Sequence, residues 1–440
     1  MFLTRKYTLG CGSLVKPLSK AFDFATWTQL VPESEIRRLL RFKVKYYFAG
    51  GKPGVLPTEA LSHTLIEFGE HCLQLIERGE NHRVIDLFNY CPTEGLRELR
   101  EILANFLKER DGLDVSWEDI IVTTGSQQAI YAILDVLLNP EDVVIIPRPA
   151  YLGFVNAAIK FRARLVTVPM TEAGIDPEHV KRATRLSYEK FGKKPDLIYV
   201  IPDSDNPSGT TIPLKKREEL FEVANDEGIL IVEDSAYREI QFCDERIPPI
   251  KSFDEDNSVV AYLRSSSKEA AVFRIGYSVL PSKLKKEVIK SKGYMDLNTP
   301  VITQMIAKLY YQRYFKEHIG EVRRGYKQRC EVMKRAIDEY FPDGKRTDPK
   351  GGFFIWWNAA DSSFDSKRFL EEVALKNNLV YVPGSAFFPR FGYAYDPEKN
   401  SIERMMPETH GMRLGYSYLC PKDILEGINK LGLLLSEAFI

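Results

Sequence analysis

The sequence predicts an α/β fold in which helices flank a largely parallel sheet, followed by a smaller α+β domain. Between residues 119 and 265, apolar runs typical of strands alternate with segments of helical period. Several runs are apolar without interruption, as expected of strands that helices cover on both faces. From about Pro300 the pattern changes to one long helical stretch and then to shorter elements. The alternation therefore predicts a three-layer domain, and the change of pattern predicts a second domain.

The elements of the large domain follow from their patterns in chain order. "DIIVTT" (119–124) is predicted to be a strand, and "SQQAIYAILDVLL" (126–138) a helix, because its apolar residues recur on one helical face. A second helix is predicted over 214–228, ending at Gly228, since glycine favours helix C-termini. Five further apolar runs are predicted strands: 142–147, 163–170, 196–202, 228–234 and 258–265.

The second part of the chain is predicted to begin with a connecting helix over 301–341, a stretch without proline. After it come strand candidates at 351–357 and 379–388, a helix near 366–376 and a final helix over 421–439. We expect a large domain over 60–305 and a small domain made of 306–440 with the N-terminal segment 1–59. That segment has no sheet pattern of its own, so it is expected to pack on the small domain or on a partner chain.

Composition excludes several classes of protein. The 440 residues include 61 Lys+Arg and 61 Asp+Glu, so the net charge gives no reason to expect nucleic acid or an acidic membrane as a partner. No apolar run approaches the roughly 18 residues of a membrane span, and no signal peptide is apparent. The cysteines are scattered, without CxxC or zinc spacing: Cys11, Cys72, Cys91, Cys243, Cys330 and Cys420. We therefore expect a cytoplasmic protein with buried thiols and no metal.

Two short motifs lie where a strand passes into a turn. In "TTGSQQA" (123–129) a helix is predicted to start at Ser126, and free N–H groups at a helix start can bind an anion. Taken alone, an ordinary serine-capped turn is the favoured interpretation. In "PDSDNPSGT" (202–210), Asn206 lies either in a plain turn or as an amide held towards a ligand.

Two further motifs follow predicted strands. Asp234 ends an apolar strand and has no basic neighbour before Arg238, which points to a cationic cofactor as its partner. In "YLRSSSKEAAVFRIGY" (262–277), Lys268 follows a buried strand, where desolvation would lower its pKa and leave an amine able to form a Schiff base. The alternative is a solvated loop lysine. Together, however, the four motifs supply donors for a phosphate, a carboxylate for a pyridine nitrogen and a lysine for an aldehyde, as pyridoxal phosphate requires.

The same motifs, in the same order, resemble the class I/II aminotransferases of the fold type I pyridoxal-phosphate enzymes. "NYCPTEGLRELREILANFL", "GSQQA", "RPAYLGF", "DNPSG", "VEDSAY", "SSSK", "RIGY", "VPGSAFF" and "MRLGYSY" carry the resemblance over nearly the whole chain. "SEIRRLL" and "YYFAGGKPGVLP" are similar to the branch with 2-aminoadipate, kynurenine and aromatic aminotransferases.

The resemblance implies a catalytic role for several residues. Lys268 would hold the cofactor as a Schiff base and then move a proton between the substrate α-carbon and the cofactor. Asp234 would pair with the pyridinium nitrogen, and Tyr151 would stack on the ring. Asn206, which also borders the substrate, and Tyr237 would hydrogen-bond the ring oxygen.

The resemblance also implies binding residues and a partner. The phosphate would be held by Ser126, Gln127, Ser265, Ser267 and Arg274. Tyr90 would reach the phosphate of a neighbouring subunit, so a homodimer with shared active sites is expected. Arg413 would bind the substrate α-carboxylate, and Gly50 and Gly51 would border the substrate pocket.

Two stretches depart from the family pattern. The family usually has six residues with Pro-Gly between the lysine and the arginine, whereas "EAAVF" has five and contains neither. The loop must take another path, which weakens the role of Arg274. The stretch 389–411 is longer than expected before Arg413, and we expect a surface excursion rather than a lid.

The predicted function is amino-group transfer from an aromatic, 2-aminoadipate-like or aliphatic amino acid to a 2-oxo acid, expected to be 2-oxoglutarate, in a ping-pong cycle. Phe353, Phe354 and Trp356 line the pocket or simply pack in the core. One alternative is a lyase or decarboxylase with the same cofactor, since all these reactions start from the same adduct. Another is the effector-binding half of a transcription regulator, but no room for a winged-helix domain is expected before "FAGG".

Overall fold

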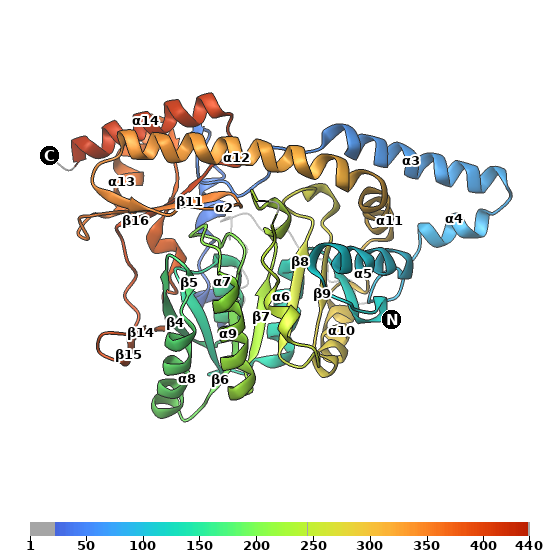
Figure 1. Ribbon diagram of the computed structural model, residues 1–440, viewed down its shortest axis with the longest axis horizontal. Helices are drawn as coiled ribbons and strands as arrows, with labels where there is room; N and C mark the ends of the chain where they lie inside the picture. The colour runs from blue at the N-terminus through green and yellow to red at the C-terminus, as the bar shows by residue number, and fades with distance from the viewer. Residues whose placement is uncertain (1–22, 244, 439–440) are drawn as a thin grey trace, which may run out of the picture.

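The computed structural model describes residues 23–243 and 245–438, and it is built on two sheets (Figure 1). The large sheet has ten strands in the order β15-β14-β4-β3-β6-β7-β8-β9-β2, with β5 paired to β4. Their bounds are β2 (Ile120–Thr123), β3 (Val143–Arg148), β4 (Arg164–Thr171), β5 (Gly174–Ile175), β6 (Pro195–Val200), β7 (Leu230–Asp234), β8 (Val260–Ser265), β9 (Gly276–Val279), β14 (Tyr393–Asp396) and β15 (Ser401–Arg404). All six strands predicted between residues 119 and 265 lie in this sheet.

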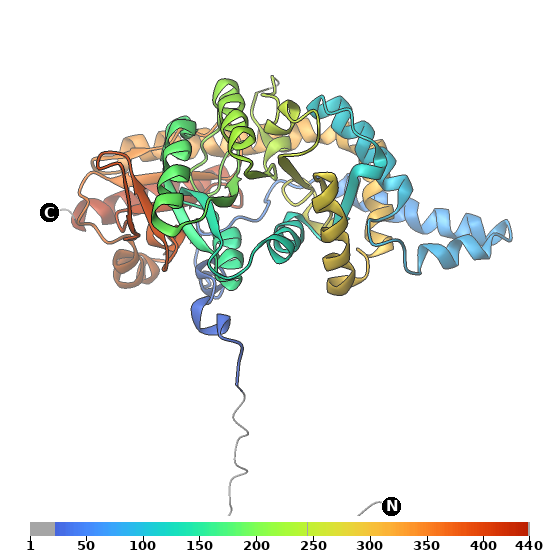
Figure 2. The same ribbon diagram turned by 90° about the horizontal axis from the view of Figure 1, so that it is seen from below.

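The large sheet is mostly parallel and lies between two layers of helices, as predicted. β14, β4, β3, β6, β7 and β8 run parallel, and β9 and β2 complete the far edge in antiparallel pairs. On one face lie α8 (Pro177–Phe191) and α9 (Leu214–Glu227), and on the other α6 (Ser126–Leu137), α7 (Leu152–Lys160) and α10 (Ser282–Asp296) (Figure 2). Helices therefore shield both faces of the sheet from solvent, which explains why the sequences of β3, β6 and β8 are largely apolar.

The small domain is built on a four-stranded antiparallel sheet in the order β10-β11-β16-β13. These strands are β10 (Gly344–Arg346), β11 (Phe354–Ala359), β13 (Val382–Pro383) and β16 (Gly411–Gly415). α12 (Phe315–Tyr340) and α14 (Pro421–Ala438) pack on each other over this sheet (Figure 1). The predicted helix near 366–376 is confirmed as α13 (Ser366–Phe369), which continues in helical turns to Asn377.

The predicted connecting helix is present but contains one irregular turn. α11 (Val301–Leu309) passes through a π-helical turn at Tyr310–Tyr314 into α12. Tyr310 and Tyr311 pack edge to face, and the Tyr311 and Phe106 ring centroids lie 5.0 Å apart. The wider turn lets these large rings point into the core, an adjustment that helical periodicity alone does not reveal.

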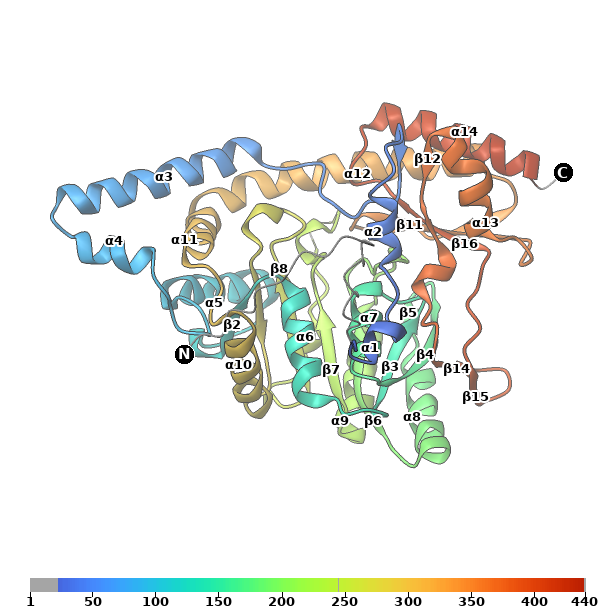
Figure 3. The same cartoon turned by 180° about the vertical axis from the view of Figure 1, so that it is seen from behind.

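The N-terminal segment, from Asp23 onward, lies across both domains. α1 (Trp27–Leu30) contacts α7, whereas β1 (Tyr46–Tyr47) pairs with β12 (Leu379–Val380) of the small domain. α2 (Glu35–Leu39) lies between them and contacts β13. Two further helices, α3 (Thr58–Glu77) and α4 (Asn81–Leu87), project from the body as an arm and lead into α5 (Arg97–Asp111) (Figure 3).

The expectation of a surface excursion at 389–411 is wrong. β14 and β15 form a hairpin that extends the edge of the large sheet beyond β4. Tyr395 is fully buried and Ile402 is 6% exposed, both in the apolar core beneath α8. The alternation in "YAYD" and "SIER" is a strand pattern, and the open edge of β4 supplies its backbone partners.

Within the described residues no helix is long and apolar enough to cross a membrane. The same residues contain no group of three or more His, Cys, Asp or Glu that could hold a metal ion. Cys72 and Cys330 are buried, but Cys243 and Cys420 are exposed, so the expectation of buried thiols is wrong for these two. Cys11 lies outside the described residues.

Candidate active site

The predicted lysine lies just after β8, at the carboxyl end of the sheet. Its Nζ is 4.8 Å from the centroid of the Tyr237 ring and 5.6 Å from that of Phe353. Desolvation lowers the pKa of Lys268 to about 8, because it outweighs the opposing charge of Asp234. The nearby guanidinium groups of Arg413 and Arg274 lower this pKa further. A neutral amine is therefore accessible near physiological pH, as a nucleophilic lysine requires.

Asp234 ends the neighbouring strand β7 and is 3% exposed. Its Oδ2 accepts a hydrogen bond of 3.0 Å from the hydroxyl of Tyr199, on β6. Its Oδ1 has no hydrogen-bond partner within the described part of the chain. Burial raises the pKa of Asp234 to about 6, although Tyr199 and Lys268 act in the opposite direction. A buried carboxylate with one free oxygen is ready to accept a bond from a cationic N–H group.

Sequence analysis missed Tyr199, although a signal was present. A tyrosine within the otherwise aliphatic run "DLIYVIP" needs a partner for its hydroxyl when it is buried. Tyr199 is fully buried, and its ring stacks on that of Phe154 at 3.9 Å between centroids. The stacking and the hydrogen bond together fix the orientation of the Asp234 carboxylate.

An anion cradle forms where α6 begins, at the end of β2. Gly125 has φ +76°, and a Cβ there would come within 2.9 Å of Arg274 Nη2. Arg274 donates a bond of 3.1 Å to Ser267 Oγ, and the hydroxyls of Ser265 and Ser267 lie 2.7 Å apart. The side chains of Arg274, Ser265 and Ser267 therefore meet, and Arg274 also reaches the start of α6, where Ser126 presents a free helix N-terminus.

The shortened loop still brings Arg274 to this cradle. A 3₁₀ turn at Ala271–Phe273 replaces the usual path, and Arg274 takes φ +52° at its end. Ser266 N and Oγ both donate to the carbonyl of Ile275, which closes the loop at its base. The left-handed residue turns the arginine back towards Ser267, so this shorter loop brings Arg274 to Ser267 and Gly125.

The side chains of Tyr151 and Gln127 form a hydrogen bond with each other. The Tyr151 hydroxyl donates to Gln127 Oε1 at 3.1 Å, and Gln127 Nε2 donates to the Gly153 carbonyl at 3.1 Å. Burial raises the pKa of Tyr151 to about 12. The Gln127 side chain is thus engaged with Tyr151, which leaves its backbone N–H, at the start of α6, for an anion.

Arg413, on β16, is completely buried and has no carboxylate partner among the described residues. It donates to Asn206 Oδ1 and to the Ala49 carbonyl, both at 2.8 Å, and its Nε has no partner in that part of the chain. Its guanidinium lies 4.0 Å from the centroid of Phe354. Burial lowers the pKa of Arg413 to about 10. A desolvated cation of this kind is well suited to an incoming carboxylate.

The remaining predicted residues divide into two groups. Gly50 and Gly51 follow Ala49 directly, and a Cβ on Gly51 would come within 3.1 Å of the Phe354 ring. They therefore lie beside Phe354 and next to the Ala49 carbonyl that Arg413 binds, and their place at the substrate pocket stays a prediction. Tyr90, by contrast, follows the α3–α4 arm and is 77% exposed. This chain alone does not bring it to the other site residues.

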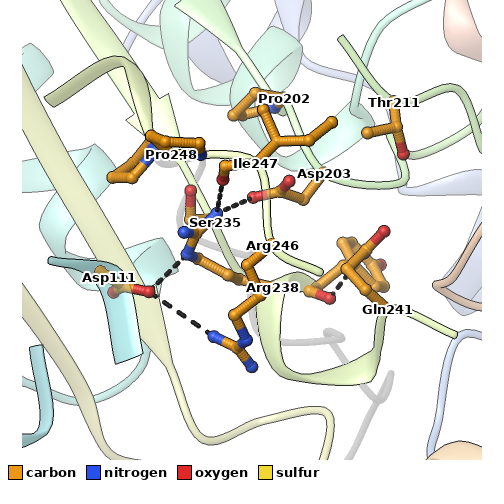
Figure 4. A network of polar contacts seen from close by, with 12 residues as sticks. Asp111, Pro202, Asp203, Thr211, Ser235, Arg238, Gln241, Arg246, Ile247 and Pro248 are labelled. Carbon is orange, nitrogen blue, oxygen red and sulfur yellow. Dashed lines mark hydrogen bonds and ion pairs between the residues drawn. The ribbon is translucent and has the colours of Figure 1, made fainter. Parts of the chain in front are cut away.

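A buried network of charges lies beneath the site (Figure 4). Arg238, the residue after Tyr237, binds Asp111 at 2.5 Å and Asp203 at 3.1 Å. Asp203 also binds Arg217 at 2.6 Å. Burial would raise the pKa of Asp203, but the two arginines outweigh it and lower the pKa to about 2. Two segments are joined by this network: the loop that contains Asn206, at its start, and the turn that contains Tyr237. The network was not predicted, because its residues are distant from one another in sequence.

Residues 70–392 match the family model for aminotransferase class I and II. The chain belongs to this aminotransferase family. It is 33% identical to aromatic-amino-acid aminotransferase 1 of Thermococcus litoralis, over 92% of each chain. Kynurenine aminotransferase of Pyrococcus horikoshii, solved with PMP, shares its fold with a TM-score of 0.82 and 31% identity, over 95% of this chain and 98% of that one.

A third relative is informative about the cofactor of this aminotransferase. The α-aminoadipate aminotransferase LysN of Thermus thermophilus, solved with N-(5'-phosphopyridoxyl)-L-leucine, has a TM-score of 0.80 and 29% identity, over 95% of this chain and 98% of that one. The family uses pyridoxal phosphate. The residues of this chain fit that group, because Asp234 Oδ1 has no hydrogen-bond partner in the described residues, Lys268 lies nearby, and Arg274 meets Ser267 and Gly125 at the start of α6. The predicted fold type I aminotransferase architecture is confirmed.

Proposed function

We propose that this aminotransferase moves the amino group of an aromatic, 2-aminoadipate-like or aliphatic amino acid to a 2-oxo acid, with 2-oxoglutarate as the acceptor. The observation that carries the proposal is the buried guanidinium of Arg413, which has no carboxylate partner in the described residues and lies against Phe354. Both substrates of the reaction carry an α-carboxylate, so one arginine serves both halves of a ping-pong cycle. The printed names of the relatives support an aromatic or aminoadipate donor.

The proposed division of labour follows from the geometry. Pyridoxal phosphate, when bound, withdraws electrons from the substrate α-carbon and so weakens its bonds. Lys268 would bind the cofactor and move the proton from the α-carbon. Asp234, whose carboxylate Tyr199 orients, would keep the pyridine nitrogen protonated. Tyr151, Tyr237 and Asn206 would position the ring.

The proposed phosphate contacts come from the cradle and the proposed partner from the arm. Ser265, Ser267 and Arg274, with the start of α6 at Ser126 and Gln127, would hold the phosphate.

The arm formed by α3 and α4 has an exposed apolar face made of Leu65, Ile66, Leu73, Ile76, Ile85 and Phe88. A face of this kind favours burial against another surface. We propose a homodimer in which this arm meets a second copy and Tyr90 completes the partner's site.

The remaining predictions concern location and domain limits. We propose the division into 60–305 and 306–440 with 1–59, with the exception of 393–404, whose strands belong to the large sheet. A cytoplasmic location stays a prediction.

Steady-state kinetics test the function. A panel of aromatic, dicarboxylic and aliphatic amino acids is assayed with 2-oxoglutarate, and initial rates are measured as both substrates vary. We expect parallel double-reciprocal lines and stoichiometric glutamate for at least one donor class. Intersecting lines would contradict the ping-pong cycle, and product without glutamate would contradict amino-group transfer and favour a lyase or decarboxylase.

Complementation tests the shared site. Lys268→Ala and Tyr90→Ala are each purified, and the two are then mixed under conditions that exchange subunits. A mixed dimer has one site with Lys268 from one chain and Tyr90 from the other, so activity should rise above that of either variant. No gain on mixing, with exchange verified by a mass tag, would contradict the shared site.

A further inference from the structure

The hairpin of β14 and β15 joins the two domains. Its chain leaves the small domain after Phe388 and returns to it at Thr409, while its strands lie in the large sheet (Figure 3). We call residues 389–411 the strap. β14 pairs in parallel with β4, with Tyr393 opposite Val166 and Ala394 opposite Thr167. The small domain is therefore connected to the large sheet at a point far in sequence from the connecting helix α12.

The strap is firmly docked on the large domain. Tyr395 is fully buried, and its ring lies 5.5 Å from that of His179 on α8. Ile402 is 6% exposed, and its carbonyl accepts a bond of 2.6 Å from Lys190. Burial of the Tyr395 ring and the Ile402 side chain, together with the β14–β4 ladder, opposes separation of the hairpin from the sheet.

The strap is also docked on the small domain, close to β16. Ser366 N donates to the Thr409 carbonyl at 3.0 Å, and Ala359 N donates to the His410 carbonyl at 3.1 Å. Only residues 389–392 and 405–408 lie between the hairpin and these contacts, and an extended chain spans at most about 3.5 Å per residue. Gly392 and Met405 bond to each other at 3.0 Å and tie the two connectors together. β16, which carries Arg413, begins immediately afterwards.

The other contacts between the domains on this side of the molecule flank a cavity. A cavity of about 650 Å³ separates the domains here and is lined by residues of both, including Trp356 and Thr211. One ion pair outside the strap crosses its rim, Lys345–Glu172 at 2.6 Å, and such an exposed pair contributes little to stability. The strap adds a longer pair, Arg148–Glu408 at 3.7 Å. The strap restrains the small domain here together with two backbone bonds, from Ala150 N to the Phe387 carbonyl at 3.0 Å and from Phe242 N to the Lys350 carbonyl at 2.8 Å.

We propose that the strap positions Arg413: by fixing β16 against the large sheet, it holds the guanidinium opposite Asn206 before a substrate arrives. The inference rests on the proposed function, in which Arg413 binds the substrate carboxylate. The bond of 2.8 Å from Arg413 to Asn206 crosses from the small to the large domain, so a small shift of β16 breaks it. Tyr395 and Ile402 are therefore positioning residues that act through Arg413.

Release of the strap would lower the fraction of molecules in which Arg413 is aligned for substrate binding. When only a fraction of molecules holds the binding-competent arrangement, the apparent affinity falls in proportion to that fraction. If release of the strap leaves Arg413 aligned in about one molecule in ten, apparent KM rises about tenfold for both the amino acid and the oxo acid. The residues proposed to contact the cofactor within this chain lie in the large domain, so we expect cofactor affinity to stay unchanged.

The test compares the double variant Tyr395→Ala/Ile402→Ala with Glu398→Ala. Glu398 is exposed at the turn of the same hairpin and contributes only backbone to its contacts, so its variant leaves the docking intact. We expect KM for donor and acceptor to rise about tenfold in the double variant, kcat to change about twofold or less, and the cofactor dissociation constant to stay unchanged. Hydrogen exchange should become faster in β14 and in β16.

Fast exchange in β14 with wild-type KM values and slow exchange in β16 would overturn the inference. Should the double variant fold poorly, Ile402→Ala alone provides a milder release with the same readouts. Arg413→Lys tests the proposed role of Arg413 separately from the positioning role of the strap. If Arg413→Lys leaves KM unchanged, the proposed role of Arg413 is wrong; if it raises KM and the released strap does not, only the positioning role is wrong.

Discussion

The hydrogen bond between Tyr199 and Asp234 allows a quantitative prediction. In Tyr199→Phe the ring still stacks on Phe154, and only the bond of 3.0 Å to the carboxylate is lost. A buried hydrogen bond to a charged group contributes about 1.5–3 kcal/mol. One pKa unit corresponds to about 1.4 kcal/mol, so the loss should raise the pKa of Asp234 by about one to two units.

The sign follows from which form the bond stabilises. Tyr199 donates to the ionised carboxylate, so its removal favours the protonated acid and raises the pKa above its present value of about 6. Tight cofactor binding requires the ionised form to pair with the pyridinium nitrogen. The pH below which cofactor affinity falls should therefore lie about one to two units higher in the variant.

The assay is a titration of apoprotein with pyridoxal phosphate, monitored by absorbance at a series of pH values. Tyr310→Phe is the matched control, because Tyr310 is equally buried and its hydroxyl has no hydrogen-bond partner in the described residues. The control should show the wild-type midpoint. An unchanged midpoint in Tyr199→Phe, or the same displacement in both variants, would refute the reasoning.

Three further predictions concern other parts of the site. Gly125→Ala should weaken pyridoxal phosphate binding because its Cβ would crowd Arg274 Nη2 at 2.9 Å, whereas binding of unphosphorylated pyridoxal should change little in the same titration. Arg413→Lys should raise KM for amino acids about tenfold to a hundredfold in steady-state assays, since about 1.5–3 kcal/mol of charge-assisted bonding is lost. Asp203→Asn should lower the free energy of unfolding by about 3–5 kcal/mol in urea denaturation, because Arg217 and Arg238 lose a buried anion. Because the folded pKa of Asp203 is about 2, below its unfolded value, its contribution should be complete above about pH 4 and lost as pH falls towards 2.

Local patterns were sufficient for most of the large sheet and for the order of its motifs. Lys268 and Asp234 each follow a strand whose apolar run is visible in the sequence, and parallel strands bring their carboxyl ends together. Arg274 was predicted as a phosphate-binding residue, but the path of its loop was not, because it depends on a left-handed residue after a 3₁₀ turn. That path depends on the folded loop rather than on composition.

Contacts between segments that are distant in the chain could not be predicted from local sequence patterns. Arg413 and Asn206 are separated by 207 positions, and Tyr199 and Asp234 by 35. The strand pattern of "YAYD" and "SIER" was visible, but nothing local identifies β4 as the partner of β14. The hairpin was therefore expected at the surface, although the structure buries it in the core of the large domain.

The central claim is that Lys268 carries amino-group transfer on bound pyridoxal phosphate. The most direct measurement is the absorption spectrum of the purified holoenzyme, before and after addition of single amino acids without an oxo acid, with Lys268→Ala in parallel. The account predicts that a lysine-bound cofactor band is present in the wild type only, and that a suitable donor converts it to pyridoxamine phosphate with release of one oxo acid. A lysine-bound band in Lys268→Ala, or a wild-type band that no amino acid converts, would contradict it.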